Sequence, residues 1–343
     1  MLKNSSYLLF FLCLMIGTFI SISANSWVSV WMGLEINLLS FIPLMNNNNM
    51  ISTESSLKYF LTQALASMIL LFSIISLYFF FNMNWKFFHN LIENMILLSL
   101  FLKSGTAPFH FWFPEIIEGL SWMNALIFMT WQKIAPLFLI SYYMNFNILI
   151  ISIIISSFIG AINGINQTSY KKLLAFSSIN HIGWMLTGML FNETLWFFYF
   201  INYCLLNIPI VLLFFNFKIF QFNQIFNNLM ISPILKMLLM FNFLSLGGLP
   251  PFLGFLPKWM IMELLMKNNQ YFLLWFLIMM SLITLFFYLR ISISSFLLNS
   301  FSQKWLTYKF IMMKNNFTQL LFLIFSSISI FGLFSFSLIF ILM

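Results

Sequence analysis

Charge is scarce in this sequence, and one acidic residue type is missing altogether. The 343 residues include no aspartate and only seven glutamates, and 6% of them are charged against 62% that are hydrophobic. A soluble globular protein does not have enough interior to bury that much apolar surface. The composition therefore excludes a soluble domain and indicates a protein that crosses a membrane several times.

Cysteine and histidine are also scarce, which limits the metal chemistry open to the chain. Cys13 and Cys204 lie in separate apolar runs, and the three histidines are scattered. Two isolated cysteines cannot hold an iron–sulfur cluster or a structural zinc ion. No glycine-rich phosphate-binding loop is present beside a strand pattern either. These absences argue against an iron–sulfur cluster, a structural zinc ion and a nucleotide-binding loop in this chain.

Apolar runs separated by short polar breaks make up nearly the whole chain. A helix needs about 20 apolar residues to cross a bilayer, and the sequence predicts eleven such spans. They cover residues 6–24, 26–45, 57–81, 91–113, 121–143, 147–165, 171–191, 194–216, 232–267, 271–297 and 317–342. The first is interpreted as an uncleaved span rather than a signal peptide, because another apolar run follows it directly.

The basic residues favour one orientation of these spans. Lys86 and Lys267 would lie on one side of the membrane, and most of the other basic residues on or near the N-terminal side. These are Lys3, Lys58, Lys171, Lys172, Lys218, Lys236, Arg290, Lys304, Lys309 and Lys314. Basic loops stay in the cytoplasm or the mitochondrial matrix. We therefore interpret the net charge of +8 as topological, with the N-terminus on the matrix side, rather than as a nucleic-acid surface.

Five ionisable residues lie well inside the predicted spans. Lys103 and Lys133 are about twelve residues, or roughly 18 Å, into the fourth and fifth spans, and Glu35 is roughly 14 Å into the second. His181 is halfway along the seventh span, and Lys258 belongs to the long ninth one. A charge at the midplane costs roughly 2.5–3.5 kcal/mol on insertion scales. Snorkelling of Lys103 or Lys133 to the interface would need a longer side chain than lysine has at this depth. We expect these groups to face the protein interior, either as proton carriers or as a structural Glu–Lys pair.

Glycine and proline concentrate beside two of these lysines. Gly105 and Pro108 follow Lys103, and the run Leu246-Gly-Gly-Leu-Pro-Pro-Phe-Leu-Gly-Phe-Leu-Pro-Lys258 interrupts the ninth span. The two broken spans are five apart, so they would run in opposite directions, which is typical of inverted repeats with discontinuous helices. We therefore predict an all-α polytopic membrane protein built from two inverted five-helix repeats and one C-terminal helix. The expected parts are residues 6–143, 147–297 and 317–342.

Lysine suits proton transfer at such a depth. Burial favours its neutral form, and a nearby carboxylate favours its charged form. A lysine whose acidic partner approaches or retreats therefore gains and loses a proton near neutral pH, as part of a coupled set of groups.

Five segments around these residues together resemble the antiporter-like membrane subunits of respiratory complex I, the mitochondrial NADH–ubiquinone oxidoreductase, in their animal, arthropod-type form. They are Met32-Gly-Leu-Glu-Ile-Asn, Lys103-Ser-Gly-Thr-Ala-Pro-Phe-His-Phe-Trp-Phe-Pro-Glu, Trp131-Gln-Lys-Ile-Ala-Pro, Ser177-Ser-Ile-Asn-His-Ile-Gly-Trp and Gly247-Gly-Leu-Pro-Pro-Phe-Leu-Gly-Phe-Leu-Pro-Lys-Trp. The resemblance covers essentially the whole chain.

The resemblance implies a proton-pumping module of the inner mitochondrial membrane that lacks the first helices of bacterial members. It implies that Glu35 pairs with Lys103, that Lys133 links two half-channels, and that Lys258 lies on the exit side. His181 would be a relay or hydration residue between them. NADH, FMN, iron–sulfur clusters and ubiquinone would be bound by other complex I subunits. Those subunits, especially its membrane-arm neighbours, and lipids would be its partners, and nucleic acid would not.

Three functions remain open. The chain could translocate protons driven by redox chemistry elsewhere in a large complex, act as a free-standing cation/proton antiporter of the same fold, or serve as a scaffold held together by its charged residues. The shorter helix bundle favours the first function, because such a bundle needs partners to cover it.

Overall fold

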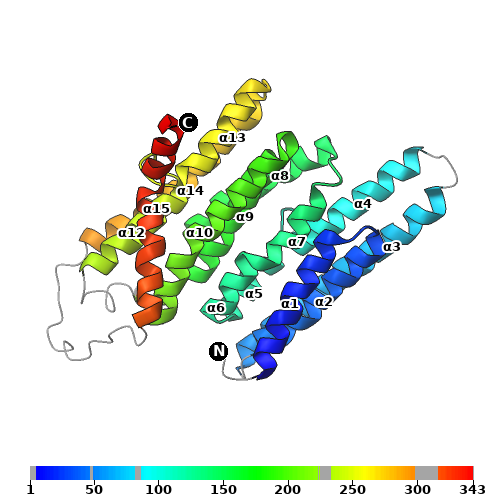
Figure 1. Ribbon diagram of the computed structural model, residues 1–343, viewed down its shortest axis with the longest axis horizontal. Coiled ribbons are helices and arrows are strands. Elements are labelled where there is room, and N and C mark those ends of the chain that lie inside the picture. The colour runs from blue at the N-terminus through cyan, green and yellow to red at the C-terminus, as the bar shows by residue number, and fades with distance from the viewer. Residues whose placement is uncertain are drawn as a thin grey trace. The chain divides into compact units, whose positions relative to one another are not determined.

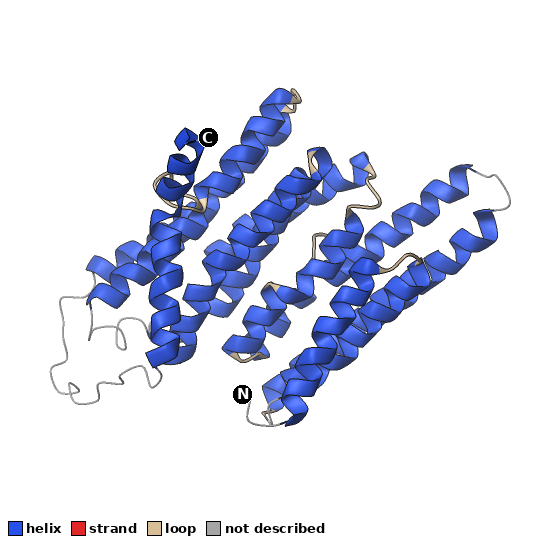
Figure 2. Ribbon diagram, viewed as in Figure 1, coloured by secondary structure: helices blue, strands red, loops and turns tan. Residues whose placement is uncertain are grey.

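A computed structural model shows a helical chain (Figure 2). It describes residues 5–46, 49–81, 86–222, 224, 233–297 and 316–342. Within these ranges the only strand-like pairing is an isolated bridge between Ser169 and Gln221. Lys3, Lys304, Lys309 and Lys314, which the sequence assigns to the N-terminal side, lie outside the described residues.

The chain divides into two compact units between Ser152 and Ile153. The first unit holds α1 (Ser5–Ser23), α2 (Trp27–Met45), α3 (Met50–Phe81), α4 (Lys86–Ser104), α5 (Trp112–Gly119), α6 (Trp122–Met129), α7 (Trp131–Ile140) and the start of α8 (Phe146–Ile165). The second holds the rest of α8, α9 (Tyr170–Phe191), α10 (Glu193–Phe217), α12 (Pro233–Gly247), α13 (Phe255–Lys267), α14 (Tyr271–Leu297) and α15 (Asn316–Leu342). The two predicted inverted repeats remain a prediction.

In the first unit, α1 packs along α2, α2 contacts α3, and α3 contacts α4 and α5 (Figure 1). The α1–α2 pair is close because glycines face each other. A Cβ atom added to Gly33 would lie 2.7 Å from the backbone nitrogen of Ser21, and one on Gly17 would lie 2.9 Å from that of Asn37. Small residues at such an interface let two membrane helices approach closely. This contact fixes the position of α2, which carries Glu35.

In the second unit, α9 is the central helix. It contacts α10, α13 and α14, and Gly160 of α8 lies so near it that an added Cβ atom would be 2.6 Å from the backbone nitrogen of Asn180. Nearly all side chains of α9 are buried. A helix that is buried on every side can carry polar groups only where the protein satisfies them, and His181 lies halfway along it.

Eight stretches among the described residues are long and apolar enough to cross a membrane. They are α1, α2, α3, α6 with α7, α8, α9, α10 and α14. The segments α12 and α15 contribute shorter apolar stretches. The helical, multi-span class is therefore confirmed, and the total of eleven spans stays a prediction.

Two predicted spans are interrupted. The fourth, expected over 91–113 with a break at Gly105 and Pro108, is broken there: α4 ends at Ser104, because Gly105 has a φ angle of +72° that a regular helix cannot include. The fifth, expected as one helix over 121–143, is two helices that meet at Thr130. The Thr130 hydroxyl donates a hydrogen bond to the Leu126 carbonyl at 2.7 Å, a side-chain bond of a kind that bends helices.

Both predicted glycine–proline breaks are present, and both helices end in the same way. Gly105 and Gly248 have left-handed φ angles of +72° and +83°. The next residue in each case donates its backbone N–H five residues back, from Thr106 to Phe101 at 3.1 Å and from Leu249 to Leu244 at 3.3 Å. This is the Schellman motif, which satisfies carbonyl groups that a helix end leaves open.

We expect Gly33→Ala to destabilise the α1–α2 pair by about 1–3 kcal/mol, because overpacking a close helix contact forces the backbones apart. The measurement is thermal unfolding of the detergent-solubilised protein. Gly247→Ala is the control, since a Cβ atom there would meet its nearest neighbour at 3.5 Å. Equal stability of the two variants would contradict the close contact.

Candidate functional site

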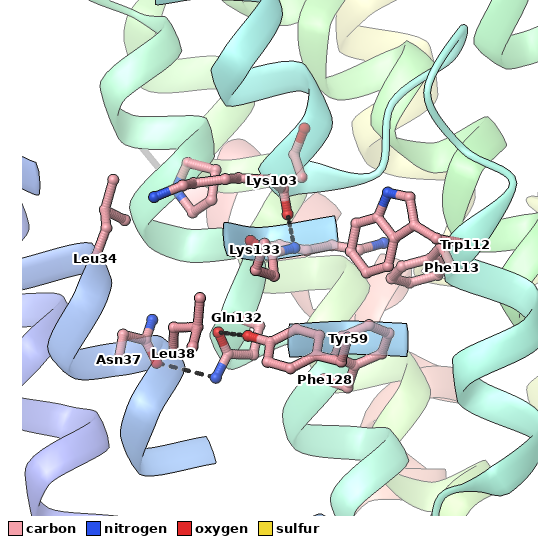
Figure 3. Close-up of a pocket in the computed structure, with 13 residues that line it drawn as sticks. Leu34, Asn37, Leu38, Tyr59, Lys103, Trp112, Phe113, Phe128, Gln132 and Lys133 are labelled. Atoms are coloured by element: carbon pink, nitrogen blue, oxygen red, sulfur yellow. Dashed lines mark hydrogen bonds between the residues drawn. The ribbon is translucent and has the colours of Figure 1, made fainter. Parts of the chain in front are cut away.

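The first unit encloses a small polar cavity where α2 to α7 converge (Figure 3). Its volume is about 20 Å³, which is room for about one water molecule. The lining residues are Leu34, Asn37, Leu38, Tyr59, Gln63, Lys103, Ser104, Trp112, Phe113, Phe128, Gln132, Lys133 and Pro136. Two lysines that lie thirty positions apart in the sequence thus line the same internal space.

Lys103 and Lys133 are both buried, with exposed fractions of 7% and 2%. The ammonium group of Lys133 lies over the ring of Phe113, 4.6 Å from its centroid, and the ring face attracts a cation. Phe113 stacks in turn on Phe128, with ring centroids 4.9 Å apart. The aromatic wall therefore fixes the place of Lys133.

Lys103 is held by the end of its own helix. It lies in the last turn of α4, where the partial negative charge of the helix dipole favours a cation. Its carbonyl oxygen accepts a hydrogen bond from Gln63 Nε2 at 3.4 Å. The break after Ser104 therefore places the lysine at a helix terminus instead of in mid-helix, which lowers the cost of its charge.

Glu35 faces the same region from α2. Its charge acts on Lys103 and on Tyr59, and its buried Oε1 atom has no hydrogen-bond partner among the described residues. Glu35 and Lys103 form no direct ion pair in this part of the chain. The resemblance implied such a pair, and the geometry instead shows a carboxylate and an ammonium group that interact across a gap.

A chain of neutral polar side chains joins three helices beside the lysines. Gln132 Nε2 donates to Asn37 Oδ1 at 2.9 Å, and the Tyr59 hydroxyl donates to Gln132 Oε1 at 3.4 Å (Figure 3). Asn37, Tyr59 and Gln132 were not singled out from the sequence. The only available signal was position, because Gln132 precedes Lys133 and Asn37 comes two residues after Glu35.

The second unit contains the other two expected residues. His181 is 5% exposed, and its Nδ1 atom is 2.8 Å from the hydroxyl oxygen of Tyr199 on α10. The ring of Tyr203 packs beside the imidazole with centroids 5.2 Å apart. Sequence reasoning missed both tyrosines, since neutral aromatic residues are common throughout this chain.

Lys258 is buried on α13 and reaches back to the end of α12. Its Nζ atom donates to the carbonyl oxygen of Gly247 at 2.8 Å and lies 5.9 Å from the centre of the Trp184 ring. Gly247 is the last residue of α12, so its carbonyl is one that the helix end leaves open. Each unit therefore sets a buried lysine at the carboxyl end of a broken helix.

The chain matches a known family and close relatives of it. Residues 24–284 match the family model described as "NADH:quinone oxidoreductase/Mrp antiporter, TM". A protein of Anopheles gambiae named NADH-ubiquinone oxidoreductase chain 2 is 60% identical, with 87% of this chain and 88% of that protein covered. The protein of the same name from Aedes aegypti is 55% identical over the same shares.

A solved structure has the same fold. It is that of respiratory complex I from Thermus thermophilus with bound Aureothin, one chain of which superimposes with a TM-score of 0.85. The sequences are 21% identical, and the match covers 95% of this chain and 77% of that chain. At this identity the likeness shows the fold alone.

We expect Gln132→Leu to cost about 1–3 kcal/mol of stability, because it leaves the buried amide of Asn37 without its partner. Replacing both residues, as Asn37→Leu with Gln132→Leu, should cost less than the single change, because the Asn37 amide is then removed as well and only the Tyr59 hydroxyl loses its partner. Thermal unfolding in detergent measures both. Gln167→Leu is the control, because the Gln167 amide lies in an exposed hydrogen bond to the Asn163 carbonyl. A double variant that loses more stability than Gln132→Leu alone would contradict the hydrogen-bonded chain.

Proposed function

Since the chain belongs to the NADH:quinone oxidoreductase and Mrp antiporter family of membrane subunits, with the NADH-ubiquinone oxidoreductase chain 2 proteins as close relatives, we propose that its buried lysines carry the protons it translocates. It is an antiporter-like, proton-translocating subunit of respiratory complex I, the H⁺-translocating NADH:ubiquinone oxidoreductase. Its place is the inner mitochondrial membrane, which it crosses several times, and other complex I subunits are its partners.

One observation carries the residue assignment: Lys103 and Lys133 line the same cavity, which has room for about one water molecule. Water bridges two polar groups nearly as well as a direct hydrogen bond does. A charged Lys103 gives a proton to such a water while the water gives another to a neutral Lys133. The charge then moves from one lysine to the other without either side chain leaving its place.

Glu35 sets the direction in which this exchange runs. Its charge acts on Lys103, and a carboxylate favours the protonated form of a neighbouring lysine. Movement of the carboxylate toward Lys103 therefore loads that lysine with a proton, and movement away releases it. The gap between the two groups supports this role, because a lysine in a fixed, direct ion pair would keep its proton.

In the second unit, Lys258 and His181 are the side chains that carry protons. Lys258 donates to the Gly247 carbonyl, an oxygen that accepts a hydrogen bond from either the charged or the neutral amine. His181 contributes the one imidazole of α9. Both side chains are buried, and buried ionisable groups of membrane helices mark ion pathways.

The orientation and the redox chemistry belong to the same proposal. The N-terminus faces the matrix, which the excess of lysines on that side supports. NADH, FMN, the iron–sulfur clusters and ubiquinone are bound by other subunits. The small number of cysteines supports this division, because only Cys13 and Cys204 are available as thiol ligands.

Lys103→Met in assembled complex I should lower the number of protons pumped per electron while the complex still assembles. Removing a positioned acid–base group slows a proton-transfer step by about 10²–10⁴-fold. This subunit then contributes no protons to the number pumped per electron. Proton uptake and NADH oxidation are measured together in proteoliposomes. Lys267→Met is the control, because Lys267 is exposed and pairs with Glu263 on its own helix. If an assembled Lys103→Met complex pumps the same number of protons per electron, Lys103 has only a structural role.

The family name also includes the Mrp antiporter, so a free-standing cation/proton antiporter is the second candidate. The purified chain, reconstituted alone in liposomes with a sodium gradient, should exchange no Na⁺ for H⁺. A pH-sensitive dye inside the vesicles reports the exchange, and intact complex I in matched vesicles serves as the control for proton movement. Sustained exchange by the lone chain would favour the antiporter.

A further inference from the structure

The hydrogen bond between Tyr199 and His181 determines which form of the imidazole is stable. Tyr199 lies on α10 and is 2% exposed, and its hydroxyl oxygen is 2.8 Å from His181 Nδ1. Among the described residues, this nitrogen is the only hydrogen-bonding partner of that hydroxyl group. The hydrogen of the Tyr199 hydroxyl therefore has to be satisfied within this contact with His181.

The direction of the bond follows from the cost of burial. Burying an O–H group that has no acceptor is unfavourable, and His181 Nδ1 is the acceptor at hand. The tyrosine consequently donates, and Nδ1 accepts. A neutral imidazole carries one hydrogen, so with Nδ1 as the acceptor that hydrogen lies on Nε2.

From this contact we propose that Tyr199 is a positioning residue that holds His181 neutral, with its hydrogen on Nε2, so that His181 serves the proton path as a hydrogen-bond donor. The proposal rests on the proposed role of His181 in proton transfer. A second proton has to enter at Nδ1, and it does so only when the Tyr199 hydroxyl turns from donor to acceptor. The tyrosine thus opposes a resting positive charge on His181.

The consequence for transport is electrostatic. A fixed positive charge in the interior repels an arriving proton strongly, because charges interact more strongly there than in water. Without the hydroxyl of Tyr199, Nδ1 loses this donor, and the imidazole takes either neutral form or a second proton. The path then contains a charge that the native protein keeps out of it.

Complex I that carries substitutions in this chain provides the test, with protons pumped per electron as the readout. Tyr199→Phe keeps the ring and removes the hydroxyl, and should lower the ratio. His181→Gln keeps an N–H donor near the position of Nε2 but cannot be charged, and should retain most of the ratio. In the His181→Gln protein, adding Tyr199→Phe should cause no further loss, whereas a merely structural tyrosine would lower the ratio in both backgrounds.

Tyr170→Phe is the control, since Tyr170 is another buried tyrosine of the second unit, eleven positions before His181 on α9, and packs against Phe214 and Phe222. It should pump like the unaltered complex. A Tyr199→Phe complex that pumps normally, or a His181→Gln complex that loses as much as His181→Leu, would overturn the assignment of Tyr199 alone. Normal pumping by His181→Leu would show that His181 has no part in proton transfer, which overturns its proposed role and this inference together.

Discussion

An ionised amine in the membrane interior is stable only when protein groups replace the water it has lost. Three of the buried lysines, Lys103, Lys133 and Lys258, meet this requirement in different ways. Lys133 lies over the ring of Phe113, Lys258 donates to a backbone carbonyl, and Lys103 lies in the last turn of its helix and senses the charge of Glu35. Rings, carbonyls and helix ends stabilise a cation by partial charges, so the neutral amine also fits these places.

The broken helices connect this electrostatic requirement with the backbone. A chain within a bilayer has to satisfy its own N–H and C=O groups, and both breaks do so through a glycine in the left-handed conformation followed by a bond five residues back. The helix ends that result carry partial negative charge. Lys103 belongs to the helix that ends there, and Lys258 reaches the end of the preceding helix from α13. The break therefore creates the site as well as interrupting the span.

The sequence predicts those features of the structure that depend on residue types unusual within an apolar span. Gly105 and Gly248 stand out in apolar spans, as do the lysines beside them, so both breaks and the buried charges were expected. The bend at Thr130 was not, because a threonine side-chain bond leaves no distinct pattern. Asn37, Gln132 and Tyr199 were missed for a similar reason, since neutral polar and aromatic residues become significant only through their neighbours in space.

The scarcity of acidic residues fits a chain whose buried lysines have to gain and lose protons. Glu54, Glu115 and Glu263 form exposed ion pairs with Lys58 and Lys267, pairs of a kind that contributes little to stability. Glu35, in contrast, acts on the buried Lys103 across a gap. A carboxylate in contact with each buried lysine would hold its proton permanently, whereas amides and hydroxyls reorient to suit either state. A chain that must load and unload its lysines is therefore better served by neutral dipoles and one adjustable carboxylate than by a full set of ion pairs.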